Sequence, residues 1–169
     1  MTTEIVSAQR LRELLDYDPD TGLFARRVAT GKGGRFKSGL EPGCVSPQGY
    51  RVIAIDRVLY KAHRLAWLHV HGVWPTNHID HINGIKTDNR LVNLRDVSRS
   101  VNSQNRRDAM ANNKTSGLLG AYPARTPSRW YAVISAHRHR TYLGMFDTPE
   151  EAHAAYLNAK RRLHPGCML

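Results

Sequence analysis

Residues 79–105 contain Ile79-Asp-His-Ile-Asn-Gly84, then Asp88-Asn-Arg-Leu-Val-Asn-Leu-Arg95, then Val101-Asn-Ser-Gln-Asn105. The first segment predicts a strand that ends in a polar turn. A second short strand is expected near Leu91–Leu94, and a helix capped by Ser98 is expected after it. One carboxylate, one imidazole and several carboxamides are therefore spaced along a predicted strand, turn, strand and helix.

Four of these side chains supply the groups that metal-assisted hydrolysis of a phosphodiester requires. A histidine such as His81, near its ordinary pKa, can accept the proton of a water molecule at neutral pH. Carboxylate and carboxamide oxygens, as in Asp80 and Asn102, suit a hard cation such as Mg²⁺. A further carboxamide, Asn93, can hydrogen-bond the other imidazole nitrogen and fix its tautomer.

The range 63–105, which starts with His63-Arg-Leu-Ala-Trp67, resembles the HNH endonucleases of the phage and intron-homing type. The resemblance implies the ββα-metal (His-Me finger) fold. It also implies Asp80 and Asn102 as metal ligands, His81 as general base and Asn93 as the residue that orients His81. The implied cation is Mg²⁺, with Mn²⁺ as the alternative. No structural zinc is expected, because Cys44 and Cys167 form no Cys-x-x-Cys pair.

Other polar residues of this stretch have simpler interpretations. Asn83-Gly84 and Asp88-Asn89 are common turn formers, and we interpret both pairs as shaping the loop. His63 is expected to be structural or to contact phosphate, and the family pattern does not require His78.

Elements are also predicted on the N-terminal side of this motif. Ser7 can cap a short helix, and a strand is expected at 23–27. The ranges 50–55 and 58–62 predict a hairpin with Asp56-Arg57 at its turn. A helix is expected over 63–70, ended by Gly72 and Pro75.

The C-terminal third has a different pattern. Short strands are predicted around 118–122, 130–136 and 140–146. A helix follows with Thr148 as N-cap, Pro149 at its first position and Glu151 completing a capping box. An inward stripe is expected at Ala152, Ala155, Tyr156, Ala159 and Leu163.

The range 116–163 resembles the ethylene-response-factor (APETALA-type) DNA-binding domain, notably in Leu143-Gly144 and Phe146-Asp147. That family lays a three-stranded sheet in the major groove of double-stranded DNA. Tyr122, Ser135 and Tyr142 depart from the common plant residues, so base preference cannot be transferred. Core packing is an equal alternative for Trp130. The DNA-binding candidates, with the phosphate-contacting arginines of the nuclease helix, are Arg99, Arg106, Arg107, Lys114, Arg125, Trp130, Arg138, Arg140 and Tyr142.

The net charge of +11 over 169 residues favours a polyanionic partner, most often nucleic acid. We predict an α+β fold, with the nuclease domain in 1–107, a linker in 108–115 and a sheet-plus-helix DNA-binding domain in 116–169. No run reaches the roughly 18 apolar residues of a membrane span, so no membrane partner is expected. The expected location is cytoplasmic, in the bacterial host cell if the chain is phage-encoded.

The leading hypothesis is a metal-dependent, homing-like HNH DNA endonuclease, with double-stranded DNA as its partner. A monomer would favour nicking, whereas a homodimer could cut both strands. The alternative is a non-catalytic DNA-binding regulator that retains a nuclease-like fold. RNA as substrate is weakly disfavoured by the groove-reading module at the C-terminal end, which offers no clear aromatic platform for single strands.

Overall fold

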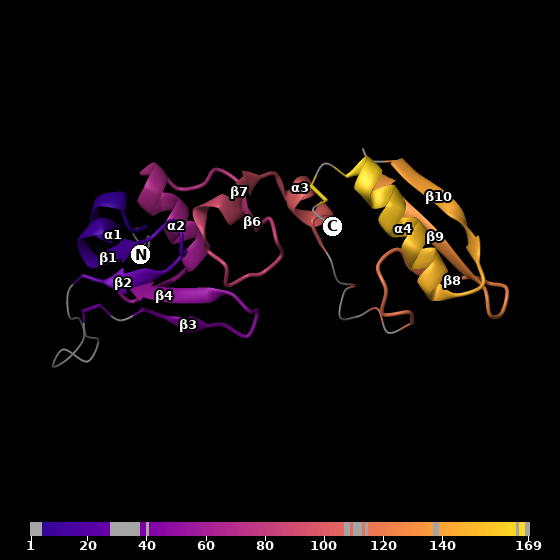
Figure 1. Ribbon diagram of the computed structural model, residues 1–169, viewed down its shortest axis with the longest axis horizontal. Coiled ribbons are helices and arrows are strands. Elements are labelled where there is room, and N and C mark those ends of the chain that lie inside the picture. Colours follow the sequence, from indigo (N-terminus) through magenta and orange to yellow (C-terminus); the bar gives the residue numbers. More distant parts are fainter. Residues whose placement is uncertain are drawn as a thin grey trace. The chain divides into compact units, whose positions relative to one another are not determined.

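The computed structural model describes residues 5–27, 38–39, 41–106, 109, 113, 115–136, 139–164 and 166–167. The chain divides into two compact units, Met1–Ser98 and Arg99–Leu169 (Figure 1). The sequence places the boundary in 108–115, most of which lies outside the described residues. The structural boundary comes earlier, so the helix at the end of the motif range, which carries Asn102, belongs to the second unit.

The first unit begins with helix α1 (Ala8–Leu14), and the Ser7 hydroxyl caps it by accepting a 3.1 Å hydrogen bond from the Arg10 N–H. Strands β1 (Leu15–Tyr17) and β2 (Phe24–Arg26) follow as an antiparallel pair. The sequence predicts β2 but not β1. Leu15 continues the apolar spacing of the helix, although its backbone is already extended.

The predicted hairpin is confirmed as β4 (Arg51–Ile55) and β5 (Val58–Lys61), with β3 (Cys44–Val45) paired to the other edge of β4. Asp56 and Arg57 form its turn with φ values of 47° and 70°, as two-residue hairpin turns require. Helix α2 (Ala62–His71) follows β5 directly. Gly72 ends it in the left-handed conformation, as predicted.

Strand β6 (His78–His81) pairs with β7 (Leu94–Val97) in antiparallel register, so that Asp80 lies opposite Arg95. The position predicted for the strand near Leu91–Leu94 is wrong. Leu91–Asn93 forms the short 3-10 turn η2, and the strand starts only at Leu94. An apolar run this short does not distinguish the two conformations.

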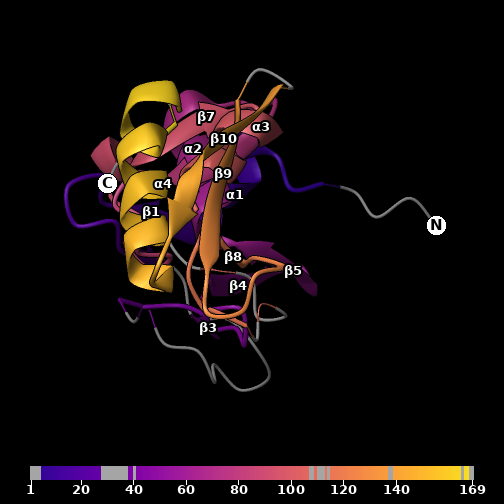
Figure 2. The ribbon, with the colours of Figure 1, turned by 90° about the vertical axis from the view of Figure 1, so that its right-hand side faces the viewer.

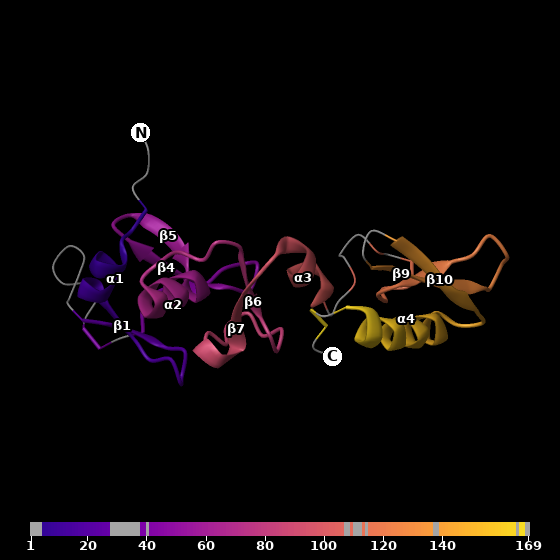
Figure 3. The ribbon, with the colours of Figure 1, turned by 90° about the horizontal axis from the view of Figure 1, so that it is seen from above.

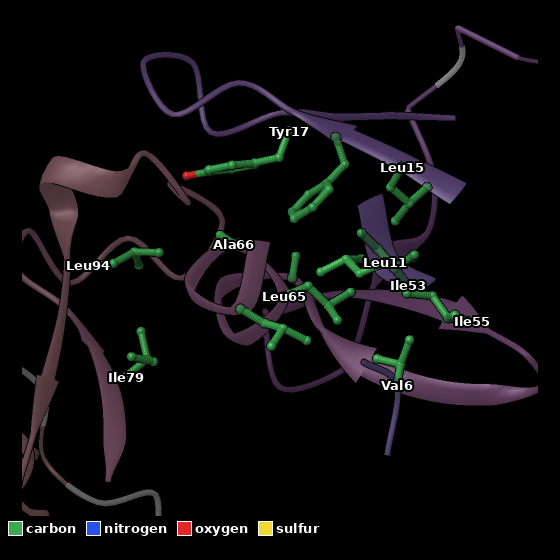
Figure 4. Close-up of a cluster of buried hydrophobic side chains, with 13 residues drawn as sticks. Val6, Leu11, Leu15, Tyr17, Ile53, Ile55, Leu65, Ala66, Ile79 and Leu94 are labelled. Carbon is green, nitrogen blue, oxygen red and sulfur yellow. The ribbon is translucent and has the colours of Figure 1, made fainter. Parts of the chain in front are cut away.

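One apolar core joins these elements. Leu11, Phe24, Ile53 and Leu65 are almost fully buried in it. Ile79 of β6 and Leu94 of β7 belong to the same cluster, as Figure 4 shows. The hairpin that carries Asp80 and His81 is therefore anchored to the core of the first unit.

The second unit starts with α3 (Arg99–Gln104), and its sheet has the order β10-β9-β8. The strands are β8 (Ala121–Pro123), β9 (Trp130–Ala136) and β10 (His139–Phe146). Helix α4 (Pro149–Leu163) covers one face of this sheet (Figures 2 and 3). Its capping box is confirmed, since the Thr148 and Glu151 side chains each accept from the other residue's backbone N–H.

The predicted inward stripe of α4 is confirmed except at its end. Ala152 and Ala159 are buried and Tyr156 packs beside them, whereas Leu163 is 39% exposed. Buried Lys160 of α4 donates to the Arg106 carbonyl oxygen, and the Gly166 N–H donates to Gln104 Oε1. These bonds explain why α3 groups with the second unit. No helix in the described part of the chain has both the length and the apolar character to cross a membrane.

Candidate active site

Asp80 and His81 lie at the end of β6, and both side chains are more than nine-tenths buried. Buried polar groups of this kind are costly unless they are hydrogen-bonded. The partners of these two residues therefore define the candidate site.

His81 has a specific carboxamide partner. Its Nε2 lies 3.2 Å from Oδ1 of Asn89, which is 2% exposed. A carboxamide oxygen only accepts, so this bond places the imidazole proton on Nε2 and the basic lone pair on Nδ1. Burial lowers the pKa of His81 below its ordinary value, although the Asn89 hydrogen bond acts in the opposite direction. The imidazole is accordingly neutral at physiological pH.

Asn89 is the site residue that sequence reasoning missed. The pair Asp88-Asn89 is interpreted from sequence as a turn former, because those residue types are common in turns. Its contact with His81 spans eight positions in the chain. The spacing of residues does not reveal which loop carboxamide turns toward the imidazole.

Asn93 holds the loop between β6 and β7. Its Oδ1 accepts from the Asn83 N–H at 2.9 Å, and its Nδ2 donates to the Asp88 carbonyl oxygen at 2.8 Å. Its backbone oxygen also accepts from the Ile82 N–H at 2.9 Å. These bonds fix the segment that carries Asn89. An orienting effect of Asn93 on His81 would therefore act through this loop, and it stays a prediction.

Asp80 is held by an arginine from the neighbouring strand. Arg95 donates to Asp80 Oδ2 from Nε at 2.9 Å and from Nη2 at 2.7 Å. Asp88 is held in a similar way by Arg90, at 2.6 Å between Nη2 and Oδ2. The hydrogen bond from Arg90 is the main cause that lowers the pKa of Asp88 to about 2. Both carboxylates are thus fixed by charge-assisted bonds.

Two further rings lie beside His81. The centroid of the His63 ring is 4.9 Å from that of His81, at an angle of 86° between the planes. Tyr50 lies 5.2 Å from His63 and 6.0 Å from His81. Burial lowers the pKa of His63 to about 3, so His63 is neutral. This packing agrees with the structural interpretation of His63.

The β1–β2 hairpin supports the same loop from the other side. The buried Tyr17 hydroxyl donates to the Asn89 carbonyl oxygen at 2.7 Å, and the Leu91 N–H donates to the Pro19 oxygen at 2.9 Å. Figure 4 shows the Tyr17 hydroxyl directed away from Leu11 and Leu15. Gly22, between β1 and β2, lies so close to the backbone of this loop that a Cβ there would be 2.4 Å from the Arg90 nitrogen.

The donors near His81 fit a hard cation better than zinc. Among the described residues, no group of three His, Cys, Asp or Glu side chains could hold a metal ion. A Mg²⁺ site needs only one or two carboxylates, because waters and substrate phosphates complete it. Asp80, on β6, is the predicted carboxylate ligand, and Asn102, on α3, is the other predicted ligand. β6, β7 and α3 follow in the chain order that the ββα interpretation requires.

In the second unit, three tyrosines lie on the sheet face opposite α4. Tyr122 and Tyr131 stack with centroids 5.5 Å apart, and Tyr142 lies 6.5 Å from Tyr131. Arg140 shares this face, since it lies two residues before Tyr142 on β10. We name this surface, consisting of Tyr122, Tyr131, Arg140 and Tyr142, the open tyrosine face. From the sequence we expected no clear aromatic platform for single strands; this surface corrects that expectation and removes it as a reason against RNA.

The remaining DNA-binding candidates lie elsewhere. Trp130 packs against the apolar core between sheet and helix, so the structure supports its core-packing alternative. Arg125 is in the loop between β8 and β9, and Arg99 and Arg106 are exposed at the two ends of α3. Arg107, Lys114 and Arg138 lie outside the described residues.

Comparison with known proteins agrees with the motif. The model of an HNH endonuclease family matches residues 60–104, which include α2, β6, β7 and α3. The resemblance of the C-terminal range to plant DNA-binding domains has no such support. No curated protein and no solved structure gives a significant match to the chain.

Proposed function

We propose that this chain is a metal-dependent DNA endonuclease that hydrolyses phosphodiester bonds, with His81 as general base. One observation carries the proposal: a buried neutral imidazole is fixed by Asn89 next to Asp80, inside the range that matches HNH endonucleases. A histidine held in one tautomer beside a carboxylate is suited to accept a proton.

His81 Nδ1 accepts a proton from the attacking water in this mechanism. The Asn89 oxygen retains the Nε2 proton, so the ring can become an imidazolium without losing its orientation. Asn93 keeps the loop of Asn89 in place through its bonds to Asn83 and Asp88.

Asp80 and Asn102 would hold the cation, most simply Mg²⁺, with Mn²⁺ as the alternative. The bound cation would neutralise charge that develops on the phosphate and the leaving 3′-oxygen. Arg95 fixes the Asp80 carboxylate through Oδ2, which limits its rotation. A carboxylate oriented in advance loses less side-chain entropy when a cation binds.

The second unit would hold double-stranded DNA through the open tyrosine face. Arg140 can form two parallel hydrogen bonds to guanine in the major groove, and Tyr142 is 58% exposed beside it. Arg125, Arg99 and Arg106 would add phosphate contacts, which give affinity but little sequence information. A homing-like role, a phage origin and nicking by a monomer belong to the same proposal.

Replacing His81 tests the catalytic half. The His81→Ala variant should lose cleavage of supercoiled plasmid by at least about a thousandfold, because no other group would accept the proton. His78→Ala is the matched control, since His78 lies on the same strand but is exposed. The His78→Ala variant should cleave the plasmid at the wild-type rate. EDTA should stop cleavage by both the wild type and His78→Ala.

The outcomes separate the two hypotheses. Wild-type rates in His81→Ala would refute the assigned base. Tight DNA binding by a wild-type protein that never cuts, with any divalent cation, would favour the non-catalytic regulator.

Replacing residues of the open tyrosine face tests the binding half. Arg140→Ala and Tyr142→Ala should each weaken duplex binding by about 1–3 kcal/mol, measured by fluorescence anisotropy in EDTA. Arg161→Ala, an exposed change on α4, should have a much smaller effect. Equal losses in Arg140→Ala and Arg161→Ala, with no loss in Tyr142→Ala, would indicate general charge attraction and would refute a specific role of this face.

A further inference from the structure

A pair of lysines lies over the ring of Tyr50, close to His81. Lys61 Nζ is 4.4 Å from the Tyr50 ring centroid, and Lys86 Nζ is 5.1 Å from it. Both distances are within the range of a cation–π interaction. Tyr50 itself lies 6.0 Å from His81, between ring centroids.

Three separate segments of the first unit build this arrangement. Tyr50 ends the loop between β3 and β4, Lys61 ends β5, and Lys86 comes from the loop between β6 and β7. Lys86 Nζ also donates to the Gln48 carbonyl oxygen at 3.0 Å, which fixes its position further. Two ammonium groups held by one ring are thus a product of the fold rather than of neighbouring sequence.

The lysines are not neutralised within the described residues. No ion pair joins either of them to a carboxylate there, although arginines pair with the site carboxylates Asp80 and Asp88. Both side chains are exposed, so an anion from solution can reach them.

The backbone at this point also favours an anion. Lys61 is the N-cap of α2, and its side chain makes no capping hydrogen bond. The first turn of α2 contains no acidic residue, so its N–H groups and dipole present positive charge. His63, in that turn, is 95% buried, and its Nδ1 has no hydrogen-bond partner in the described part of the chain.

We propose that Lys61 and Lys86, positioned by Tyr50, bind a backbone phosphate of DNA beside the bond that His81 attacks. This lysine–tyrosine site rests on the proposed nuclease function for its substrate. Phosphodiesters fit it because they carry one charge each and repeat along the strand. Binding there would bring the neighbouring phosphodiester to His81.

The salt dependence of DNA binding tests the site without any cleavage. Duplex affinity would be measured by anisotropy in EDTA between about 50 and 200 mM salt. The double variant Lys61→Gln/Lys86→Gln should reduce the size of the negative slope of log K against log[salt] by about 0.9, because one phosphate contact is lost, and each single variant should reduce it by part of that amount. Arg57→Asn is the matched control, because it removes one exposed charge from the turn at the other end of the β4–β5 hairpin. Its slope should stay at the wild-type value.

Variants of Tyr50 distinguish a positioned pair from two ordinary surface lysines. Tyr50→Phe keeps the aromatic face and should keep the slope. Tyr50→Leu should lower it toward that of the double lysine variant, provided that its thermal unfolding is unchanged. A wild-type slope in the double lysine variant, or an equal decrease in Arg57→Asn, would overturn the proposal.

The result is separable from the test of the nuclease. Loss of cleavage in His81→Ala with unchanged slopes in the lysine variants would refute this site alone. Lowered slopes together with full cleavage by His81→Ala would keep the phosphate contact and refute the assigned base.

Discussion

The two units bury different kinds of side chain. The first unit has a core of leucine, isoleucine and phenylalanine, and next to it buries Asp80, His81, Asn89 and Asn93. The core cluster of the second unit is centred on small alanines under α4, with Ile134 and Lys160 also buried in this unit, and Tyr122, Tyr131 and Tyr142 lie on the opposite face of its sheet. Polar side chains are enclosed where we propose chemistry, and aromatic side chains are exposed where we propose recognition.

This difference has an energetic basis. A polar group removed from water must be hydrogen-bonded, so the first unit depends on the partners that surround His81. The second unit depends on the close approach of its sheet to α4. Alanines fill the space between the sheet and the helix, so a larger side chain there has no room. Different changes should therefore damage each unit.

The largest effect is expected at Gly120 in the second unit. A Cβ there would be 2.1 Å from the Tyr156 ring, and its φ of 74° disfavours other residues. Gly120→Ala should lower the free energy of unfolding by about 3 kcal/mol. Gly117→Ala is the control, because its φ is 68° but nothing lies within 4 Å, and it should cost about 1 kcal/mol.

Hydrogen exchange, resolved by segment along the chain, would measure the loss of protection in Gly120→Ala and in Gly117→Ala. Protection should fall in β8, β9 and α4 for Gly120→Ala. Equal losses in both variants would show that backbone strain rather than packing limits this unit.

The next effect is expected at Asn89 in the first unit. Asn89→Ala removes the acceptor of the His81 Nε2 proton and should slow plasmid cleavage by about 10- to 100-fold. Asn89→Asp retains an acceptor oxygen and should recover part of the rate. Duplex binding in EDTA should stay unchanged in both. A folded Asn89→Ala variant that cuts at the wild-type rate would show that the tautomer is fixed by another group.

The smallest effect concerns the buried imidazole of His63. Its pKa is about 3 in the folded protein and about 6.5 in the unfolded chain. Below about pH 6.5 the unfolded chain binds a proton on His63, whereas the folded protein binds it only near pH 3. The free energy of unfolding therefore decreases as the pH falls from about 6.5 toward 3. The loss between pH 7 and pH 5 should be about 2 kcal/mol.

His63→Phe keeps a ring in place and should lack this part of the pH dependence. Urea unfolding at the two pH values would measure it. His69, whose pKa burial also lowers, remains in both proteins and cancels in the difference, whereas His81 contacts the replaced ring and does not cancel in full. The same pH dependence in both proteins would contradict the lowered pKa of His63.

The sequence predicts the elements that local signals define. The Asp56-Arg57 turn, the Gly72 helix end and the Thr148 capping box are determined by residues within a few positions, and all are confirmed. Strand β1 and the 3-10 turn at Leu91 are not predicted, because their apolar spacing suits another conformation equally well.

The candidate site is predicted only where its residues are close in the motif. The positions of Asp80 and His81 at the end of β6 follow from the strand pattern. The contacts of His81 with Asn89, and of Tyr50 with Lys61 and Lys86, join loops that are brought together only by the folded core. The alignment of tyrosines also depends on the register of β8, β9 and β10, which includes a bulge between Tyr142 and Gly144.

The contact of the β1–β2 hairpin with the Asn89 loop limits how the proposed catalytic motif can be transplanted. Residues 60–104 contain Asp80 and His81, but the Tyr17 hydroxyl that holds the Asn89 carbonyl lies far upstream. A chimera that carried only the matched range onto another DNA-binding scaffold would lose this support, together with the Pro19 contact to Leu91. An engineered graft of the proposed nuclease should therefore begin before Leu15.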